Sequence, residues 1–267
     1  MKHLAAFAWL APLCPLLCTA YAAEIDARPA NRLSLAANGV RLTGVDDGGG
    51  GSISYLHYLT PDATIGIGAE HQFIAESKWT FGTLRGSAGF GAPASKTVLF
   101  GEANVGTGDE DGRNFDYRVG VLGVSQGLGS KLSVQLETRQ IEVDRSEGNL
   151  PRLGVTVAWT PSVATNVAYA KSVSGNLGTE LTSARIDFYG REVNVFIGGA
   201  TGTADPVVLN LQPGLVLPVS DLKQGFAGIG RTFAHGQIQV VGDYLESGDS
   251  ERITVLVNFT AYFPRSQ

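Results

Sequence analysis

The chain has 267 residues and a formal net charge of −5, from 20 Lys and Arg against 25 Asp and Glu. Because binding to phosphate backbones needs concentrated Lys and Arg, this composition argues against nucleic acid as a partner. Charged residues make up 17% of the chain, against about 25% in typical soluble domains. Gly accounts for 35 of the 267 residues, where typical domains have about 7%. Few charges, many glycines and no long apolar run after the N-terminal region together favour a β-barrel.

The N-terminal segment has the pattern of a cleaved export signal. Lys2 is followed by an apolar run from Leu4 to Cys18 and by Ala20-Tyr21-Ala22, a small-residue cleavage site. The run is too short to span a bilayer comfortably and contains two prolines. We therefore expect a signal peptide at 1–22 and a short periplasmic leader at 23–31.

Both cysteines of the chain, Cys14 and Cys18, lie in this predicted signal. The mature chain would then carry no thiol, and so no disulfide, no cysteine nucleophile and no cysteine-ligated metal.

After the leader the sequence is a series of short segments with alternating apolar and polar residues, separated by turn residues. Such alternation predicts strands, because successive side chains point to opposite faces of a sheet. Fourteen segments follow from this pattern: 32–43, 52–60, 63–73, 78–89, 96–106, 114–125, 131–143, 153–160, 164–173, 181–189, 193–200, 224–233, 237–245 and 251–263. An extra hairpin within 207–219 would change this count, so the pattern is compatible with twelve to sixteen strands.

The connections between these segments fall into two alternating sets. The odd-numbered ones carry most of the acidic residues and include one long stretch, 202–222, whereas the even-numbered ones are tight, as at Pro61-Asp62 and Pro161-Ser162. Outer-membrane barrels have short periplasmic turns, longer outer loops and an even strand number. We therefore expect an antiparallel up-and-down barrel over 32–263 and a periplasmic tail at 264–267. The long stretch is expected to be a plug, an extra hairpin or a poorly ordered loop.

The last segment, Glu251 to Phe263, carries the clearest pattern. Alternate residues from Ile253 to Phe263 are apolar, while the other face is mainly polar, with Leu256 as its exception. With this alternation and an aromatic residue close to its end, the chain resembles bacterial outer-membrane β-barrels of the porin-like class, without a motif for one family. The resemblance implies a location in the outer membrane of a Gram-negative cell.

No catalytic or metal-binding pattern accompanies the strands. The three histidines that follow the signal, His57, His71 and His235, lack the partners that barrel hydrolases place beside them. The acidic residues cluster in glycine-rich loops without a calcium-binding signature. We expect no enzymatic activity, no cofactor and no bound metal.

Charged residues on the polar faces are the candidate functional residues. Pointing into a lumen, charges of both signs would line a water-filled passage and tune its selectivity, or pair and close it. The predicted lumen-lining residues are Glu70, Glu102, Arg118, Glu137, Arg139, Arg185, Asp187, Arg231, Asp243 and Arg252.

This pattern predicts a channel or translocation pore for a small or linear hydrophilic solute, with the lipid bilayer as its other partner. The chain also resembles small barrels that are encoded beside exopolysaccharide export systems, and this resemblance makes a polysaccharide a second candidate for the solute. The alternative is a closed structural or assembly barrel that accompanies an envelope or secretion system. The sequence does not indicate an oligomeric state.

Overall fold

The computed structural model describes residues 31–43, 47–74, 77–110, 112–143, 146–204, 220–247 and 250–263. The predicted signal peptide at 1–22, nearly all of the leader and the tail at 264–267 lie outside these residues, as does most of the long stretch at 202–222. Within them, no α-helix has the length and apolarity needed to cross a bilayer.

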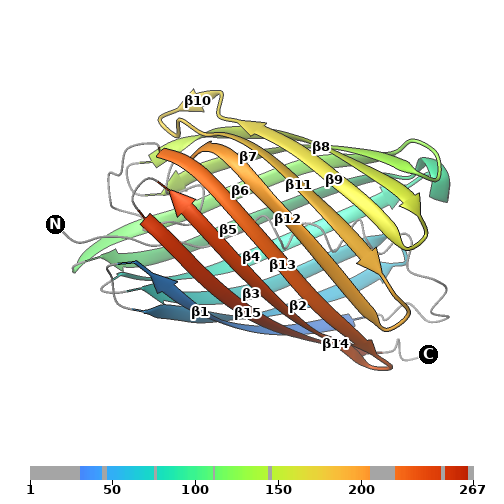
Figure 1. Ribbon diagram of the computed structural model, residues 1–267, viewed down its shortest axis with the longest axis horizontal. Helices are drawn as coiled ribbons and strands as arrows, with labels where there is room; N and C mark the ends of the chain where they lie inside the picture. Colours follow the sequence, from blue (N-terminus) through green and yellow to red (C-terminus); the bar gives the residue numbers. More distant parts are fainter. Residues whose placement is uncertain are drawn as a thin grey trace.

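Nearly all of the described chain is β-strand (Figure 1). The strands are β1 (Asn31–Leu42), β2 (Gly48–Thr60), β3 (Ala63–Ile74), β4 (Ser77–Phe90), β5 (Thr97–Glu110), β6 (Arg113–Gly127), β7 (Leu132–Val143), β8 (Ser146–Thr160), β9 (Val163–Lys171), β10 (Ser174–Gly175), β11 (Glu180–Tyr189), β12 (Val193–Ala204), β13 (Ser220–Phe233), β14 (Gly236–Ser247) and β15 (Ser250–Phe263). A single 3₁₀ turn, η1 (Pro93–Ser95), precedes β5.

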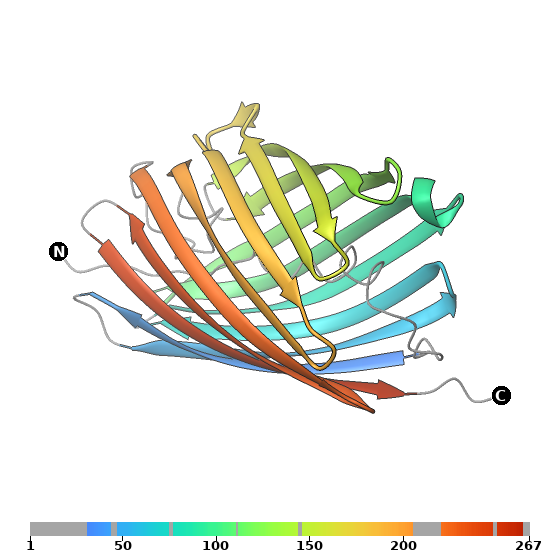
Figure 2. The same ribbon diagram turned by 45° about the vertical axis from the view of Figure 1, so that its right-hand side comes forward.

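These strands form one closed antiparallel barrel (Figure 2). Consecutive strands pair with one another, except that β9 pairs with β11 and the two-residue β10 pairs only with β8. β1 closes the ring against β15 along its full length, from Asn31↔Phe263 to Leu42↔Arg252. Without β10 the ring has fourteen strands, which confirms the predicted fold class and strand number.

Several strands run further than the sequence pattern indicated. Residues 48–51, 107–110 and 146–152 were expected in connections or outside the strands, but they continue β2, β5 and β8. Within 48–51, Gly50 shows why glycine is compatible with a strand here. A Cβ at this position would lie 2.2 Å from Gln72 Oε1, and Gln72 exchanges two hydrogen bonds of 3.2 Å with Asn38 on the far side of β2. This glycine therefore makes room for a contact between β1 and β3.

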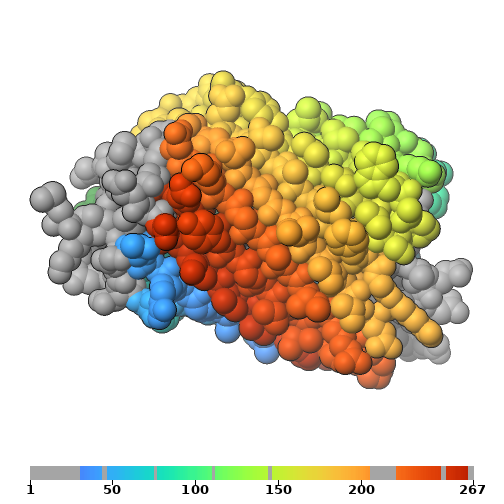
Figure 3. All heavy atoms as spheres, in the orientation of Figure 1, coloured from blue at the N-terminus to red at the C-terminus, as the bar shows by residue number. Residues whose placement is uncertain are grey.

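The outer face of the barrel is apolar. Large exposed side chains alternate along the strands with buried or partly buried ones, and include Val105, Leu122 and Ile197 with 61%, 69% and 56% of their surface exposed. Figure 3 shows β9 and β11–β15 forming a continuous surface on one side. An exposed apolar belt around a closed barrel is the surface that contacts lipid in membrane barrels.

Aromatic residues near the strand ends divide between the two faces. Trp159, Tyr169, Tyr244 and Phe263 are exposed on the outer face, where rings at the edges of a membrane are expected. Trp79 and Tyr117 also lie near strand ends, but both are buried inside the barrel.

Candidate functional site in the barrel lumen

The lumen is the candidate functional site, because the predicted charged residues gather there. We call the end of the barrel with Asn31 and Phe263 the inner end, since both termini of such barrels lie in the periplasm. Eight of the ten predicted residues lie on the lumenal face: Glu70, Glu102, Glu137, Arg139, Arg185, Asp187, Asp243 and Arg252.

Arg118 and Arg231 instead lie on the outer face, which corrects their predicted position. Arg118 is 53% exposed and forms ion pairs with Asp116 and Glu142. Arg231 is 59% exposed and pairs with Glu192. In β6 the alternation was correct but the faces were reversed, because an apolar row was assumed to face lipid. That row faces the lumen, with Phe115, Tyr117 and Val121 buried.

Glu137 is the centre of one lumenal charge network. Its side chain is completely buried and accepts hydrogen bonds from Arg139 at 3.3 Å and from Arg152 of β8 at 3.4 Å. Gln135 donates a further bond of 2.7 Å to the same carboxylate. All four residues lie on two neighbouring strands, so this network extends along the wall and not across the lumen.

Two further lumenal ion pairs also join residues of the same strand or of neighbouring strands. Arg185 contacts Asp187 on its own strand, with an Nε–Oδ1 distance of 2.9 Å, and stands 3.9 Å over the ring of Phe196. Arg252 of β15 donates to Asp243 of β14 at 2.7 Å. Within the described chain, no lumenal ion pair joins strands that are not neighbours.

Glu70 and Glu102 are bound by amides, and neither forms an ion pair with a described residue. Gln72 donates to Glu70 and Asn104 donates to Glu102, each at 2.8 Å. These two carboxylates and their amide partners make the wall of β3–β5 polar and acidic.

Three lumenal arginines were missed from the sequence: Arg32, Arg85 and Arg152. Arg32 is the first residue of a predicted segment, and Arg152 directly precedes another, so following the alternation to these two residues would have placed both on the inner face. Arg85 lies in β4, whose glycines obscured the alternation.

Large lumenal rings lie against glycines of neighbouring strands. A Cβ at Gly108 would come within 1.8 Å of the ring of Phe115, and one at Gly228 within 2.3 Å of the ring of Phe196. In the same way, Gly198 lies under the ring of Phe226, and Gly123 lies under the ring of Phe100. Since each ring occupies the space of an absent side chain, it can lie along the wall of the lumen. This accounts for part of the high glycine content.

We expect Gly228→Val to displace the ring of Phe196 from the wall. The added side chain would occupy the place of the ring, and the ring would have to move toward the lumen and away from Arg185. The expected result is a lower single-channel conductance with heat-modifiable migration retained. Gly242→Val is the control, because a Cβ there meets no atom within 4 Å, and an equal loss of conductance in both variants would contradict this interpretation.

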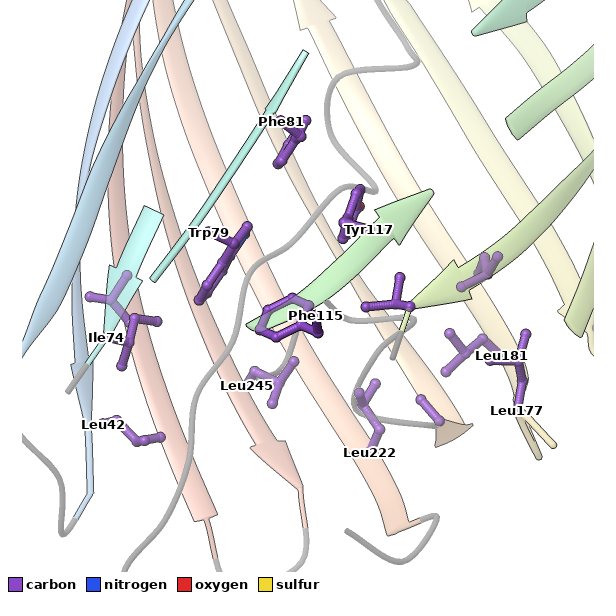
Figure 4. Packing of buried hydrophobic residues seen from close by; sticks show 14 of the residues in the cluster. Leu42, Ile74, Trp79, Phe81, Phe115, Tyr117, Leu177, Leu181, Leu222 and Leu245 are labelled. Atoms are coloured by element: carbon purple, nitrogen blue, oxygen red, sulfur yellow. The ribbon is translucent and has the colours of Figure 1, made fainter. Parts of the chain in front are cut away.

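At the outer end, an apolar cluster fills part of the lumen. We call it the mouth cluster. Figure 4 shows its side chains pointing into the space that the strands enclose. Phe81 and Tyr117 stack within it, with ring centroids 5.0 Å apart. Its members come from nine strands and the β10–β11 connection: Val40, Leu42, Ile74, Trp79, Phe81, Phe115, Tyr117, Ile141, Val143, Leu177, Leu181, Ala200, Ala204, Leu222 and Leu245. The outer end of the lumen is thus mainly apolar, although the buried pair of Arg252 and Asp243 lies beside the cluster, where Arg252 is the register partner of Leu42 and Leu245.

No protein-family model matches the sequence, and a sequence search among curated proteins finds no relative. Solved structures do share the fold. The monoaromatic hydrocarbon channel CymD matches with a TM-score of 0.63 and 10% identity, covering 90% of each chain. The toluene transporter TbuX of Ralstonia pickettii matches with 0.57 and 8% identity, covering 88% of this chain and 90% of its own.

The outer-membrane protein Omp33 of Acinetobacter baumannii matches with a TM-score of 0.53 and 11% identity, covering 88% of this chain and all of its own. At these identities the likeness concerns the fold. The chain therefore has the architecture of outer-membrane channel proteins, as the sequence resemblance implied, and the predicted outer-membrane location agrees with it.

Proposed function

We propose that this protein is an outer-membrane channel for a small hydrophilic solute. The observation that supports this most is that the contacts between lumenal side chains run along the barrel wall and not across the lumen. The ion pairs of Glu137, Asp187 and Asp243 join residues of the same or neighbouring strands, and the rings of Phe196 and Phe226, outside the mouth cluster, lie against glycines. Large and charged side chains are thus held at the wall.

A polar wall suits a hydrophilic solute. Water and polar groups of a solute can replace one another on carboxylates, amides and guanidinium groups at little cost, which an apolar wall would not allow. The mouth cluster is the barrier that such a solute has to pass. A link to exopolysaccharide export stays a prediction from the sequence resemblance.

Conductance in planar lipid bilayers tests the proposal. We expect the wild-type protein to conduct ions, and the double variant Trp79→Ala, Phe115→Ala to conduct more, because two large rings of the mouth cluster are removed. Trp159→Ala is the control, since this side chain lies on the outer face with 60% of its surface exposed. Conductance at the lipid background for both the wild type and the double variant would contradict a channel.

The mouth cluster also favours the second candidate, a closed structural or assembly barrel. Its fifteen buried residues come from most of the circumference, so it could seal the outer end permanently. In that case removing Trp79 and Phe115 would lower the temperature of unfolding and leave conductance at the background. The same pair of variants therefore separates the two functions.

A further inference from the structure

We propose that the lumen contains a binding site for an anionic oxygen group, formed by Arg32 and Arg85, and that the solute of the channel is a small organic anion. This inference rests on the proposed channel function and specifies its substrate class. It follows from the contacts that these two arginines lack, from their position in the barrel and from the hydroxyl groups beside them.

The side chain of Arg32 in β1 has no hydrogen bond or ion pair to any described residue. Its Cζ lies 5.3 Å from the ring centre of Tyr58 and 5.6 Å from that of Tyr262, and its Nε is buried without a partner. Contact with aromatic rings positions a guanidinium group and stabilises its charge, but it leaves the N–H donors unused. The Nη groups of Arg32, which unlike Nε are not buried, are available to an acceptor that enters the lumen.

Arg85 of β4 makes one hydrogen bond, from Nη2 to Ser54 Oγ of β2 at 3.2 Å, and its Nε is also buried without a partner. To reach Ser54 the side chain crosses β3 at Gly66, where a Cβ would lie 3.0 Å from Arg85 Nε. The absence of a side chain at Gly66 thus directs Arg85 toward β1 and Arg32.

The strand register brings the two groups to one part of the wall. Arg32, Leu56, Gly66 and Arg85 are successive partners across β1 to β4. Ser54, which holds Arg85, is the partner of Ser34 on β1, two residues from Arg32. Neighbouring strands are about 4.8 Å apart and two residues span about 7 Å, so both guanidinium groups can reach one small ligand.

Hydroxyl groups complete this part of the wall. Ser34 is the register partner of both Ser54 and Thr260, and its Oγ lies 2.9 Å from Thr260 Oγ1. A hydroxyl group can donate to an anionic oxygen that a guanidinium group already holds. The site therefore offers charged and neutral donors to one ligand.

The charge balance distinguishes this site from the rest of the lumen. Arg139, Arg152, Arg185 and Arg252 each form an ion pair with a carboxylate. The carboxylate closest in register to Arg85 is that of Glu102, which interacts with it electrostatically but forms no ion pair. Glu102 is the register partner of Arg85, whereas the register partners of Arg32 are Leu56 and Tyr262. One unpaired carboxylate beside two cations leaves an excess of positive charge, which an anion would compensate.

Ion selectivity and block by anions test the site. In a KCl gradient we expect the reversal potential of Arg32→Gln, Arg85→Gln to shift toward cation selectivity relative to the wild type. We also expect benzoate or inorganic phosphate to block the wild-type conductance, and the double variant to be roughly tenfold or more less sensitive, as expected when hydrogen bonds to guanidinium groups are lost. Block by benzoate alone would indicate a carboxylate solute, and block by phosphate alone a phosphorylated one.

The control is Arg118→Gln, Arg231→Gln, which changes net charge equally but on the outer face. It should keep the selectivity and block of the wild type. Gly66→Val is a second test, because it displaces Arg85 without changing any charge and should weaken the block. A conducting wild type with the same reversal potential and block as the Arg32, Arg85 variant would overturn the inference and leave the channel intact. Absence of conductance in every variant would instead overturn the proposed function.

Discussion

Replacing Glu137 with Gln is expected to destabilise the barrel by about 3–5 kcal/mol, the usual cost of removing one partner from a buried ion pair. The carboxylate is completely buried and is the ion-pair partner of both Arg139 and Arg152, whose side chains are each only 15% exposed. Without it, two neighbouring cations would repel each other in a poorly solvated part of the wall. The urea midpoint of unfolding in detergent micelles measures this loss.

Glu142→Gln on the same strand is the matched control. This side chain also pairs with an arginine, but on the outer face, where Glu142 is 56% and Arg118 53% exposed. Exposed pairs contribute roughly 1 kcal/mol or less, because water screens them. Equal effects of the two substitutions would mean that lumenal water solvates Arg139 and Arg152 as well as bulk solvent does.

An arginine in the middle of the apolar belt is expected to impair insertion into lipid. Leu122 of β6 is 69% exposed on the outer face, between Gly120 and Val124 on the same face. A charge near the bilayer midplane costs a membrane barrel about 2–4 kcal/mol. We therefore expect Leu122→Arg to lower the fraction that folds into vesicles at a given urea concentration, measured by heat-modifiable migration.

Asn114→Arg tests whether this cost depends on depth. Asn114 is an exposed residue on the outer face of the same strand but beside its outer end, beyond Asp116 and Arg118. Near the membrane interface the cost falls to about 0–1 kcal/mol, so this variant should fold almost as well as the wild type. Equal losses for both variants would contradict the membrane position inferred from the belt.

The alternation of residues was sufficient to predict the closed barrel, its fourteen strands and the lumenal position of Glu137, Arg139 and Asp243. It misplaced Arg118 because alternation assigns residues to two faces without saying which face is inside. In β6 both rows satisfy the pattern, and the apolar row with Phe115 and Tyr117 joins the mouth cluster. The rule that apolar side chains face lipid fails where the lumen itself is apolar.

The sequence by itself determined that this chain forms an antiparallel barrel with an apolar outside, because side-chain direction alternates with every residue and turn residues separate the strands. Only the tertiary structure decided which charges meet. Arg85 reaches Ser54 across Gly66, and Glu137 binds Arg152 from the next strand, contacts that depend on the register between strands. Register is a property of pairs of strands, so a pattern along one strand cannot specify it.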